Sequence, residues 1–309
     1  MKGSAGIGIE GIPEIVSVSP PVLERVFAGR AARFRSLAPN NILGDYLGAM
    51  AFLADAQHAA LTGMHFARDI EPLRGKFPIH AGKWRRDESW RSALTTILSR
   101  MEQDPIPSPA RAAMARLSAS SSTELETSAD ALLAGHYSRL KLSSATFLGS
   151  ALQVYWTALA GKVGVPSDTR FRHACPFCAS PPLAGIVRGD NKLRYLVCGL
   201  CAAEWYLPRL TCANCGSTEG ISYFSIEGDT SCAKTECCSQ CRTYLKLFYL
   251  ESAPAAEPFA DDAATLVLDT LVSEEGFFRA GPNFYLLPGA GSNSRFRLKP
   301  KQLATPSKR

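Results

Sequence analysis

Cysteine is absent from the first 174 residues of this 309-residue chain, and all ten cysteines lie between positions 175 and 241. The sequence also lacks a run of about 18 apolar residues, so it predicts no transmembrane helix. Residues 1–20 have neither a sustained apolar core nor a small-residue cleavage site, which excludes a typical secretory signal. We therefore expect a cytoplasmic protein. In a reducing cytosol, clustered cysteines indicate metal or redox chemistry rather than structural disulfides.

Most of the chain carries no excess of positive charge. The formal net charge is +6, and the segment Gly291–Arg309 alone contributes six basic residues and no acidic one. These residues are Arg295, Arg297, Lys299, Lys301, Lys308 and Arg309. Without these six of the 34 basic residues, the remainder balances its 28 acidic residues and is formally neutral. The composition predicts a disordered, solvated tail, with partner binding as the alternative.

Motifs of common enzyme classes are also missing. The sequence has no G-x-S-x-G, no Walker A and no G-x-G-x-x-G at a strand–helix junction. The five histidines are His58, His65, His80, His136 and His173. His58 and His65 lie seven residues apart on one predicted helix, where packing or surface positions are favoured over metal ligation. His173 lies two residues before Cys175 and is a candidate hydrogen-bond donor to a ligand sulfur. The sequence thus predicts no enzyme.

The first half of the chain has the apolar spacing of amphipathic helices. The predicted helices are Pro21–Leu37, a long run with Asn41 as N-cap and Ile42 on its apolar face, a stripe from Trp90 to Met101, a short helix capped by Ser122 or Thr123 and running toward Leu133, and a helix opening at Ser144. About six such helices indicate a bundle. We assign their aromatic residues to its core.

The second half has a different period. Short runs rich in Tyr, Val, Ile and Phe predict strands at Leu193–Cys198, Ile221–Ile226 and Thr243–Leu250. The segments 188–191 and 227–229 lie next to such runs and predict turns. The stretch Asp261–Glu275 returns to helical spacing. The sequence therefore changes from helices to strands near Gly164–Asp168, and a last helix follows the strands.

Four Cys-x-x-Cys pairs occupy the strand-rich region. They are Cys175/Cys178, Cys198/Cys201, Cys212/Cys215 and Cys238/Cys241, with 19 residues between the first two pairs and 22 between the last two. Two cysteines at this spacing place both sulfurs on one ion, about 2.3 Å from it, and a hairpin brings a second pair to the opposite side. The spacing therefore predicts two metal ions, each held by four thiolates.

Several alternatives remain for these cysteines. Thioredoxin-like redox pairs, disulfides and a single iron–sulfur cluster are the competing chemistries. Pairing in sequence order is favoured over an interleaved arrangement because only a short loop separates the second and third pairs. Cys232 and Cys237 are left over, and we interpret them as spare or buried thiols, with a redox or ligand-exchange role as the alternative. Zinc and iron both suit four thiolates, and a closed shell of this kind is structural rather than hydrolytic.

Together these patterns predict an α+β protein: an N-terminal helical bundle, two tandem zinc-ribbon-like four-cysteine modules and a C-terminal helix. Each module spans roughly 40 residues and is too small to bury a sufficient core, so metal binding supplies folding free energy on the order of 10 kcal/mol. The expected segments are an N-terminal arm (1–20), a helical domain (21–168), a first module (169–207), a second module (208–252), a C-terminal helix with its extension (253–289) and the basic tail (290–309).

Nucleic-acid binding is the main rival function, because many zinc ribbons bind DNA or RNA. The segment Arg170–Glu251 has nine Lys or Arg and seven Asp or Glu residues, a formal charge of +2. Each divalent ion with four thiolates adds about −2, which makes the metal region negative overall. Arg188, Lys192 and Arg194 form only a small basic hairpin. A phosphate-binding surface needs a larger positive cluster, so we predict no nucleic-acid partner.

The order of these motifs resembles the formate dehydrogenase accessory protein FdhE family. The resemblance rests on Cys175-Pro-Phe-Cys178, Leu193-Arg-Tyr-Leu-Val-Cys198-Gly-Leu-Cys201 with Glu204-Trp205, Cys212-Ala-Asn-Cys215, and Cys238-Ser-Gln-Cys241 followed by Thr243-Tyr-Leu-Lys246. The helix Ala260–Asp269 and the ending Asn283-Phe-Tyr-Leu-Leu-Pro-Gly289 are similar to that family's C-terminal signature. The specific motifs cover Arg170–Gly289, and the helical half is similar in general character.

This resemblance implies a cytoplasmic, non-enzymatic maturation factor with a chaperone-like role. Such a protein is needed to produce active respiratory formate dehydrogenase and contacts the catalytic subunit of that enzyme. The resemblance also implies rubredoxin-like modules, with iron favoured over zinc. The implied ligands are Cys175, Cys178, Cys198, Cys201, Cys212, Cys215, Cys238 and Cys241. Iron with four thiolates can pass one electron, which makes a small electron-transfer protein a third hypothesis.

Overall fold

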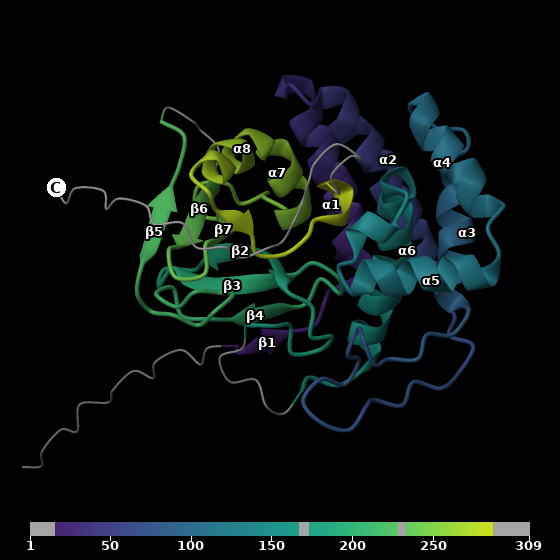
Figure 1. The fold of residues 1–309 in the computed structure, drawn as a ribbon, viewed down its shortest axis with the longest axis horizontal. Coiled ribbons are helices and arrows are strands. Elements are labelled where there is room, and N and C mark those ends of the chain that lie inside the picture. The colour runs from purple at the N-terminus through teal and green to yellow at the C-terminus, as the bar shows by residue number, and fades with distance from the viewer. Residues whose placement is uncertain (1–15, 167–172, 228–232, 287–309) are drawn as a thin grey trace, which may run out of the picture.

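The protein has the mixed helix-and-sheet structure expected from its sequence. The computed structural model describes residues 16–166, 173–227 and 233–286. Helices α1–α6 gather beside a β-sheet, and α7 and α8 lie over that sheet (Figure 1). Among the described residues, no helix combines the length and the apolar character needed to cross a membrane. The predicted basic tail lies outside the described residues.

Six helices form the bundle. They are α1 (Leu23–Leu37), α2 (Gly44–Thr62), α3 (Ser89–Met101), α4 (Ser108–Ser118), α5 (Ser122–Leu133) and α6 (Leu142–Lys162), with short 3-10 turns at Ala38–Asn40 and Tyr137–Arg139. Helix α6 is central, because every residue from Ala151 to Ala160 is buried and it contacts each of the other five helices. A helix that is apolar on nearly all sides lies in the core of a protein.

The apolar stripes predicted most of these helices. The stripe from Trp90 to Met101 is confirmed as the buried face of α3. Two details near the start of α2 are wrong. Leu43, not Asn41, is the N-cap, and Ile42 is 92% exposed because it lies in the turn before the helix. Helix α5 starts one residue earlier than predicted, because Ser121 forms a capping box with Glu124.

A single eight-stranded sheet contains all the described strands. They are β1 (Val18–Ser19), β2 (Pro182–Arg188), β3 (Leu193–Cys198), β4 (Glu204–Tyr206), β5 (Ile221–Phe224), β6 (Ala233–Cys238), β7 (Thr243–Tyr249) and β8 (Phe278–Arg279). Their order is β1-β4-β3-β2-β7-β6-β5, with β8 paired to β7. The strand at Leu193–Cys198 is confirmed as predicted, and those at 221 and 243 end slightly earlier than predicted.

The two cysteine modules are tandem in the sequence, and both contribute strands to this one sheet, so they are not separate structural units. Strands β2 and β7 pair in parallel, with Gly185 opposite Leu247 and Ile186 opposite Phe248. Both strands are almost entirely buried, which is typical of central strands covered on both faces. The modules are therefore joined through backbone hydrogen bonds and a common core. Although each module is small, its stability therefore does not depend on metal binding alone.

The predicted C-terminal helix is two short helices, α7 (Pro258–Ala264) and α8 (Leu266–Glu274). The break at Thr265 has an electrostatic cause. The buried ammonium of Lys246 donates to the backbone carbonyls of Asp262 and Thr265 at 2.8 and 3.1 Å. The Lys246 ammonium thus binds carbonyl oxygens at the point where the predicted helix is interrupted. A 3-10 turn at Phe284–Leu286 then returns the chain to the bundle.

Candidate metal centres

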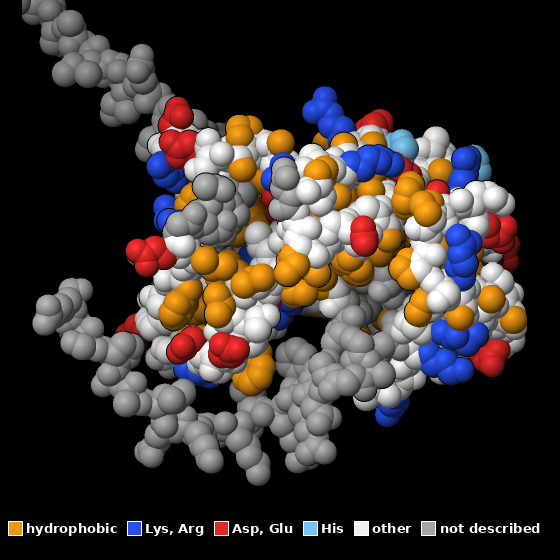
Figure 2. All heavy atoms as spheres, turned by 90° about the horizontal axis from the view of Figure 1, so that it is seen from above, with side chains coloured by type: hydrophobic (Ala, Val, Ile, Leu, Met, Phe, Trp, Pro, Cys, Tyr) orange, Lys and Arg blue, Asp and Glu red, His pale blue; other side chains and the backbone are white. Residues whose placement is uncertain are grey.

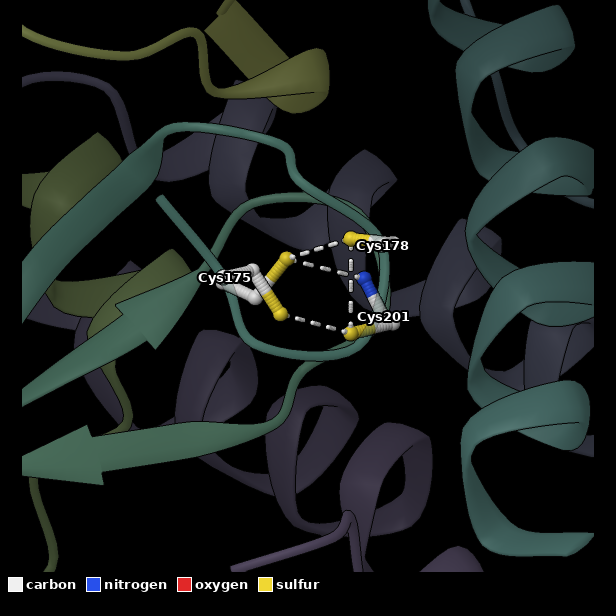
Figure 3. A group of neighbouring side chains, drawn as sticks. Cys175, Cys178 and Cys201 are labelled. Carbon is white, nitrogen blue, oxygen red and sulfur yellow. Dashed lines mark hydrogen bonds between the residues drawn. The ribbon is translucent and has the colours of Figure 1, made fainter. Parts of the chain in front are cut away.

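The first cluster consists of Cys175, Cys178, Cys198 and Cys201. Its sulfur atoms lie 3.5 Å apart for Cys175 and Cys201, 3.4 Å for Cys178 and Cys198, and 3.7 Å for Cys178 and Cys201. Figure 3 shows the side chains of Cys175, Cys178 and Cys201 converging from two turns of the chain. All four cysteines are fully buried. The pairs thus combine in sequence order.

The second cluster consists of Cys212, Cys215, Cys238 and Cys241. The sulfur atoms are 3.6 Å apart for Cys212 and Cys241 and 3.7 Å apart for Cys215 and Cys238. All four ligand atoms lie within 4.8 Å of one another, as they do in the first cluster. Cys215 is exposed and Cys241 is half-buried, so this cluster reaches the surface.

Each Cys-x-x-Cys pair lies in a tight turn of the same geometry, which we call a knuckle. The residue after the second cysteine has a positive φ in all four knuckles: 64° at Ala179, 57° at Ala202, 79° at Gly216 and 57° at Arg242. Three of these are not glycine, and the left-handed conformation costs such residues roughly 1–2 kcal/mol each. No residue type typical of this conformation marks these three positions in the sequence. The residues keep this strained conformation because the rest of the turn, which holds the two sulfurs in place, requires it.

Backbone amides of the knuckles donate to the cysteine sulfurs. The amides of Leu200 and Cys201 lie 3.4 and 3.3 Å from the Cys198 sulfur. In the second cluster, the amides of Asn214 and Cys215 lie 3.4 and 3.5 Å from the Cys212 sulfur. Donors aimed at a sulfur stabilise its thiolate form and tune a bound metal.

Burial makes several thiolates in one cluster costly. It raises the pKa of Cys175 and Cys201 well above the ordinary value. Burial opposes ionisation of Cys178 as well, but hydrogen bonds from the neighbouring thiols outweigh it and lower the pKa of Cys178 well below its ordinary value. The surroundings of the first cluster therefore favour ionisation of Cys178 and oppose ionisation of Cys175 and Cys201. A cation among the sulfurs would remove that opposition.

The second cluster has a similar imbalance. Burial raises the pKa of Cys212 to about 12. Burial also opposes ionisation of Cys241, but hydrogen bonds, chiefly from the Thr243 side chain, lower its pKa to about 7. The Thr243 hydroxyl lies 3.0 Å from the Cys241 sulfur. In each cluster, hydrogen bonds thus favour the thiolate form of one cysteine, which is Cys178 in the first and Cys241 in the second.

The spacing of the sulfurs fits a tetrahedral ion. Metal–sulfur bonds of about 2.3 Å in a tetrahedron require sulfur–sulfur separations of about 3.8 Å. The shorter separations, 3.4 to 3.7 Å, are close to this value, all pairs lie within 4.8 Å, and every distance given is far longer than a disulfide bond of about 2.05 Å. Four convergent thiol groups suit both zinc and iron. Either cluster could therefore hold one metal ion.

The two clusters are anchored to different parts of the molecule. In the first cluster, the carbonyls of Phe177 and Cys178 accept from the amides of Ile79 and Ala81, at 3.1 and 2.8 Å, in the loop between α2 and α3. In the second cluster, the Arg242 side chain donates to carbonyls at the end of α8. The first cluster is therefore part of the interface with the helical bundle, and the second lies at the distal side of the sheet.

Other chemistry-bearing residues do not complete either cluster. Cys237 is buried beside the second cluster, and burial raises its pKa to about 12. Cys232 lies outside the described residues. The His173 ring contacts Gly216, where an added Cβ would lie 2.8 Å from Nε2. His173 thus packs against a knuckle of the second cluster, and its Nδ1, a candidate donor to a ligand sulfur, has no hydrogen-bond partner among the described residues.

The small basic hairpin is neutralised by acidic partners. Arg188 pairs with Glu204 at 2.7 Å and Lys192 with Glu251 at 3.0 Å. Arg194 is fully buried and pairs with Glu236. Positive and negative side chains are interspersed on the face shown in Figure 2, with apolar side chains between them. The hairpin and this face therefore lack the clustered positive charge typical of a phosphate-binding surface.

Comparison with known proteins covers both clusters and the helical bundle. Family models for FdhE match residues 15–170 (N-terminal), 174–209 (central domain) and 210–286 (C-terminal domain). A Protein FdhE homolog from Serratia proteamaculans is 37% identical over 292 residues, covering 91% of this chain and 93% of that one. Another from Cronobacter sakazakii is 36% identical over 282 residues, covering 88% and 91%.

A solved structure supports the same relationship. The crystal structure of the FdhE protein from Pseudomonas aeruginosa superposes with a TM-score of 0.79 at 32% sequence identity, covering 89% of this chain and 100% of that one. Sequence and fold therefore agree over nearly the whole described molecule. The chain belongs to the FdhE family.

Proposed function

We propose that the protein is a non-enzymatic, cytoplasmic accessory factor in the maturation of respiratory formate dehydrogenase, and that it binds the catalytic subunit of that enzyme. Membership of the FdhE family supports the link to this enzyme through the motifs described above. The observation that carries the proposal is the pair of complete four-sulfur clusters within the family's central and C-terminal regions. Closed clusters leave no open position for a substrate, so they support a binding role.

Each cluster would hold one metal ion through its four thiolates. The ligands of the first ion are Cys175, Cys178, Cys198 and Cys201, and those of the second are Cys212, Cys215, Cys238 and Cys241. Iron is favoured by the family resemblance, and zinc suits the same sulfurs. The ions would fix the knuckles that connect the sheet to the bundle on one side and to α8 on the other.

A co-purification experiment tests the accessory role. Affinity-tagged protein from formate-respiring cells is expected to recover the catalytic subunit of formate dehydrogenase, and a deletion strain is expected to lose formate oxidation. Restoring the wild-type gene should restore both, and a tagged unrelated protein serves as the control. Failure to recover the subunit, together with normal formate oxidation in the deletion strain, would contradict the proposal.

Electron transfer is a second candidate function, favoured by the exposure of Cys215. An iron ion at the surface cluster would lie close to a redox partner, whereas one in the first cluster would be surrounded by protein. Iron-loaded protein prepared without oxygen is expected to be coloured and to bleach reversibly on reduction. A colourless, zinc-loaded protein from native cells would contradict this candidate.

A further inference from the structure

Two polar groups link helix α6 to the knuckles of the first cluster, one directly and one through the loop between α2 and α3. The Gln153 side-chain amide donates to the carbonyl of Gly199 at 2.8 Å. The Trp156 indole donates to the carbonyl of Ile79 at 3.0 Å, and the Ile79 amide in turn donates to the carbonyl of Phe177 at 3.1 Å. Because Gln153 and Trp156 are three residues apart, they lie on the same face of α6.

The carbonyl that Gln153 binds belongs to a peptide group aimed at a cluster sulfur. Gly199 contributes the carbonyl of this group, and Leu200 contributes the amide that lies 3.4 Å from the Cys198 sulfur. A hydrogen bond to the carbonyl polarises the peptide and strengthens the donor at its other end. Gln153 thus acts on the sulfur through one peptide group.

A chain of buried side chains contacts the other end of the Gln153 amide. Its carbonyl oxygen accepts from the Gln57 amide at 3.2 Å, and that amide also donates to the Ser150 carbonyl at 2.9 Å. The Gln57 oxygen accepts from the Tyr285 hydroxyl, which accepts from the Arg30 guanidinium at 3.3 Å. The Gly199 carbonyl can accept only from the amide nitrogen, so it already determines the orientation of Gln153, and this chain of contacts stabilises the same orientation.

We propose that Gln153 and Trp156 are positioning residues for the metal ion of the first cluster. Gln153 orients the peptide that donates to the Cys198 sulfur, and Trp156 holds the loop that fixes the first knuckle. Partners that orient metal ligands typically change metal affinity 10- to 100-fold when they are removed. No side chain from the bundle plays this part in the hydrogen bonds described for the second cluster. The inference rests on the proposed metal binding by the first cluster.

The test compares Gln153→Met, Trp156→Phe and Gln57→Met in the full-length protein. Zinc release into excess chelator and the sulfur-to-metal absorption of the cobalt(II)-loaded protein are both measured. Gln153→Met and Trp156→Phe are expected to release the slower ion about tenfold faster, and Gln153→Met is expected to shift the absorption band. The faster ion, assigned to the second cluster, should be unaffected.

Gln57→Met is the matched control, because it removes buried amide hydrogen bonds but leaves the contact between Gln153 and Gly199. It is expected to lower the thermal midpoint as Gln153→Met does, while release of the slower ion changes less than twofold. Equal release rates in Gln153→Met and Gln57→Met would assign Gln153 a merely structural role and overturn the proposal. If Gln153→Met does not fold, Gln153→Asn replaces it, since this shorter amide withdraws from Gly199.

The outcomes separate this inference from the proposed function. Wild-type protein that binds no metal at the first cluster would contradict the proposed metal site. Wild-type protein that binds two ions, with release and absorption unchanged in Gln153→Met, would contradict only the positioning role.

Discussion

The first and second clusters have the same ligands and the same knuckle geometry but different surroundings. All four cysteines of the first cluster are fully buried, while Cys215 of the second is exposed. The first is fixed by α6 and by the loop between α2 and α3. The second is fixed by its own ribbon and by the end of α8. Because the same four-cysteine chemistry lies in unequal surroundings, an ion in the first cluster would stabilise the fold, and one in the second would be accessible for exchange or contact with a partner.

The largest expected effect follows from removing a ligand of the first cluster. Cys178→Ser is expected to prevent folding, because a structural site of this type contributes on the order of 10 kcal/mol, which is comparable to the whole stability of a domain. Soluble yield and circular dichroism measure the outcome. Cys237→Ser is the control, since this buried thiol belongs to neither cluster and its replacement should cost about 1 kcal/mol. A folded, two-ion Cys178→Ser protein would contradict the role of the first cluster.

A smaller effect is expected in the second cluster. Cys215→Ser should reduce the metal content from two ions to one and leave the circular dichroism spectrum of the remaining molecule intact. The reason is that β2 and β7 continue to pair in the core when the surface knuckle loosens. Metal analysis per polypeptide measures the change. Global unfolding of this variant would show that the two clusters are equivalent.

A buried ion cluster distinguishes the second ribbon further. Asp262 is fully buried between Lys246 and Arg279, at 3.2 and 2.6 Å. Burial opposes its ionisation, but the two cations outweigh burial and lower the pKa of Asp262. Its contribution to stability is therefore complete above the unfolded carboxyl pKa of about 3.9 and is lost as the pH falls through the lower folded pKa.

Asp262→Asn should accordingly cost about 3–5 kcal/mol at pH 7, because it leaves two buried cations, Lys246 and Arg279, with Asp269 as their one remaining carboxylate partner among the ion pairs described. The difference in unfolding free energy between wild type and variant should shrink as the pH falls below about 4. Urea denaturation of both proteins in the same buffers measures this difference. A difference that is constant between pH 7 and pH 3 would contradict the role assigned to the carboxylate.

The smallest expected effect concerns the contact between His173, which precedes the first knuckle, and Gly216, in a knuckle of the second cluster. Gly216→Ala should destabilise the protein by about 1–2 kcal/mol, because the residue has a φ of 79° and an added Cβ would lie 2.8 Å from the His173 ring. Ala202→Gly, at the equivalent position of another knuckle, should change stability by less than about 1 kcal/mol. Thermal unfolding measures the stability of both variants. Equal effects would show that the His173 ring moves aside without a loss of stability.

The cysteine spacing predicted both clusters and their pairing, because a Cys-x-x-Cys turn is a local structure whose geometry depends on few other residues. Apolar spacing predicted the stripe of α3 and the strand at Leu193–Cys198 for the same reason. Helix α4 (Ser108–Ser118) was missed, since its buried face consists of only three residues, Ala113, Met114 and Leu117.

Contacts between distant segments could not be predicted from one sequence. The parallel pairing of β2 with β7 joins segments about sixty residues apart, and the break at Thr265 depends on Lys246 from another element. In the sequence, Gln153 is simply one polar residue within an otherwise largely apolar helical segment. Its partner, the carbonyl of Gly199, lies 46 positions away in the chain, so nothing local indicated the contact.

Native mass spectrometry during incubation with a chelator tests the difference between the clusters most directly, when each species is also labelled with a thiol reagent. Two ions per chain are expected at the start, followed by a one-ion species in which Cys212, Cys215, Cys238 and Cys241 are labelled and the cysteines of the first cluster are protected. Loss of both ions in one step, with all eight cysteines labelled together, would contradict the distinction between a buried and an accessible site.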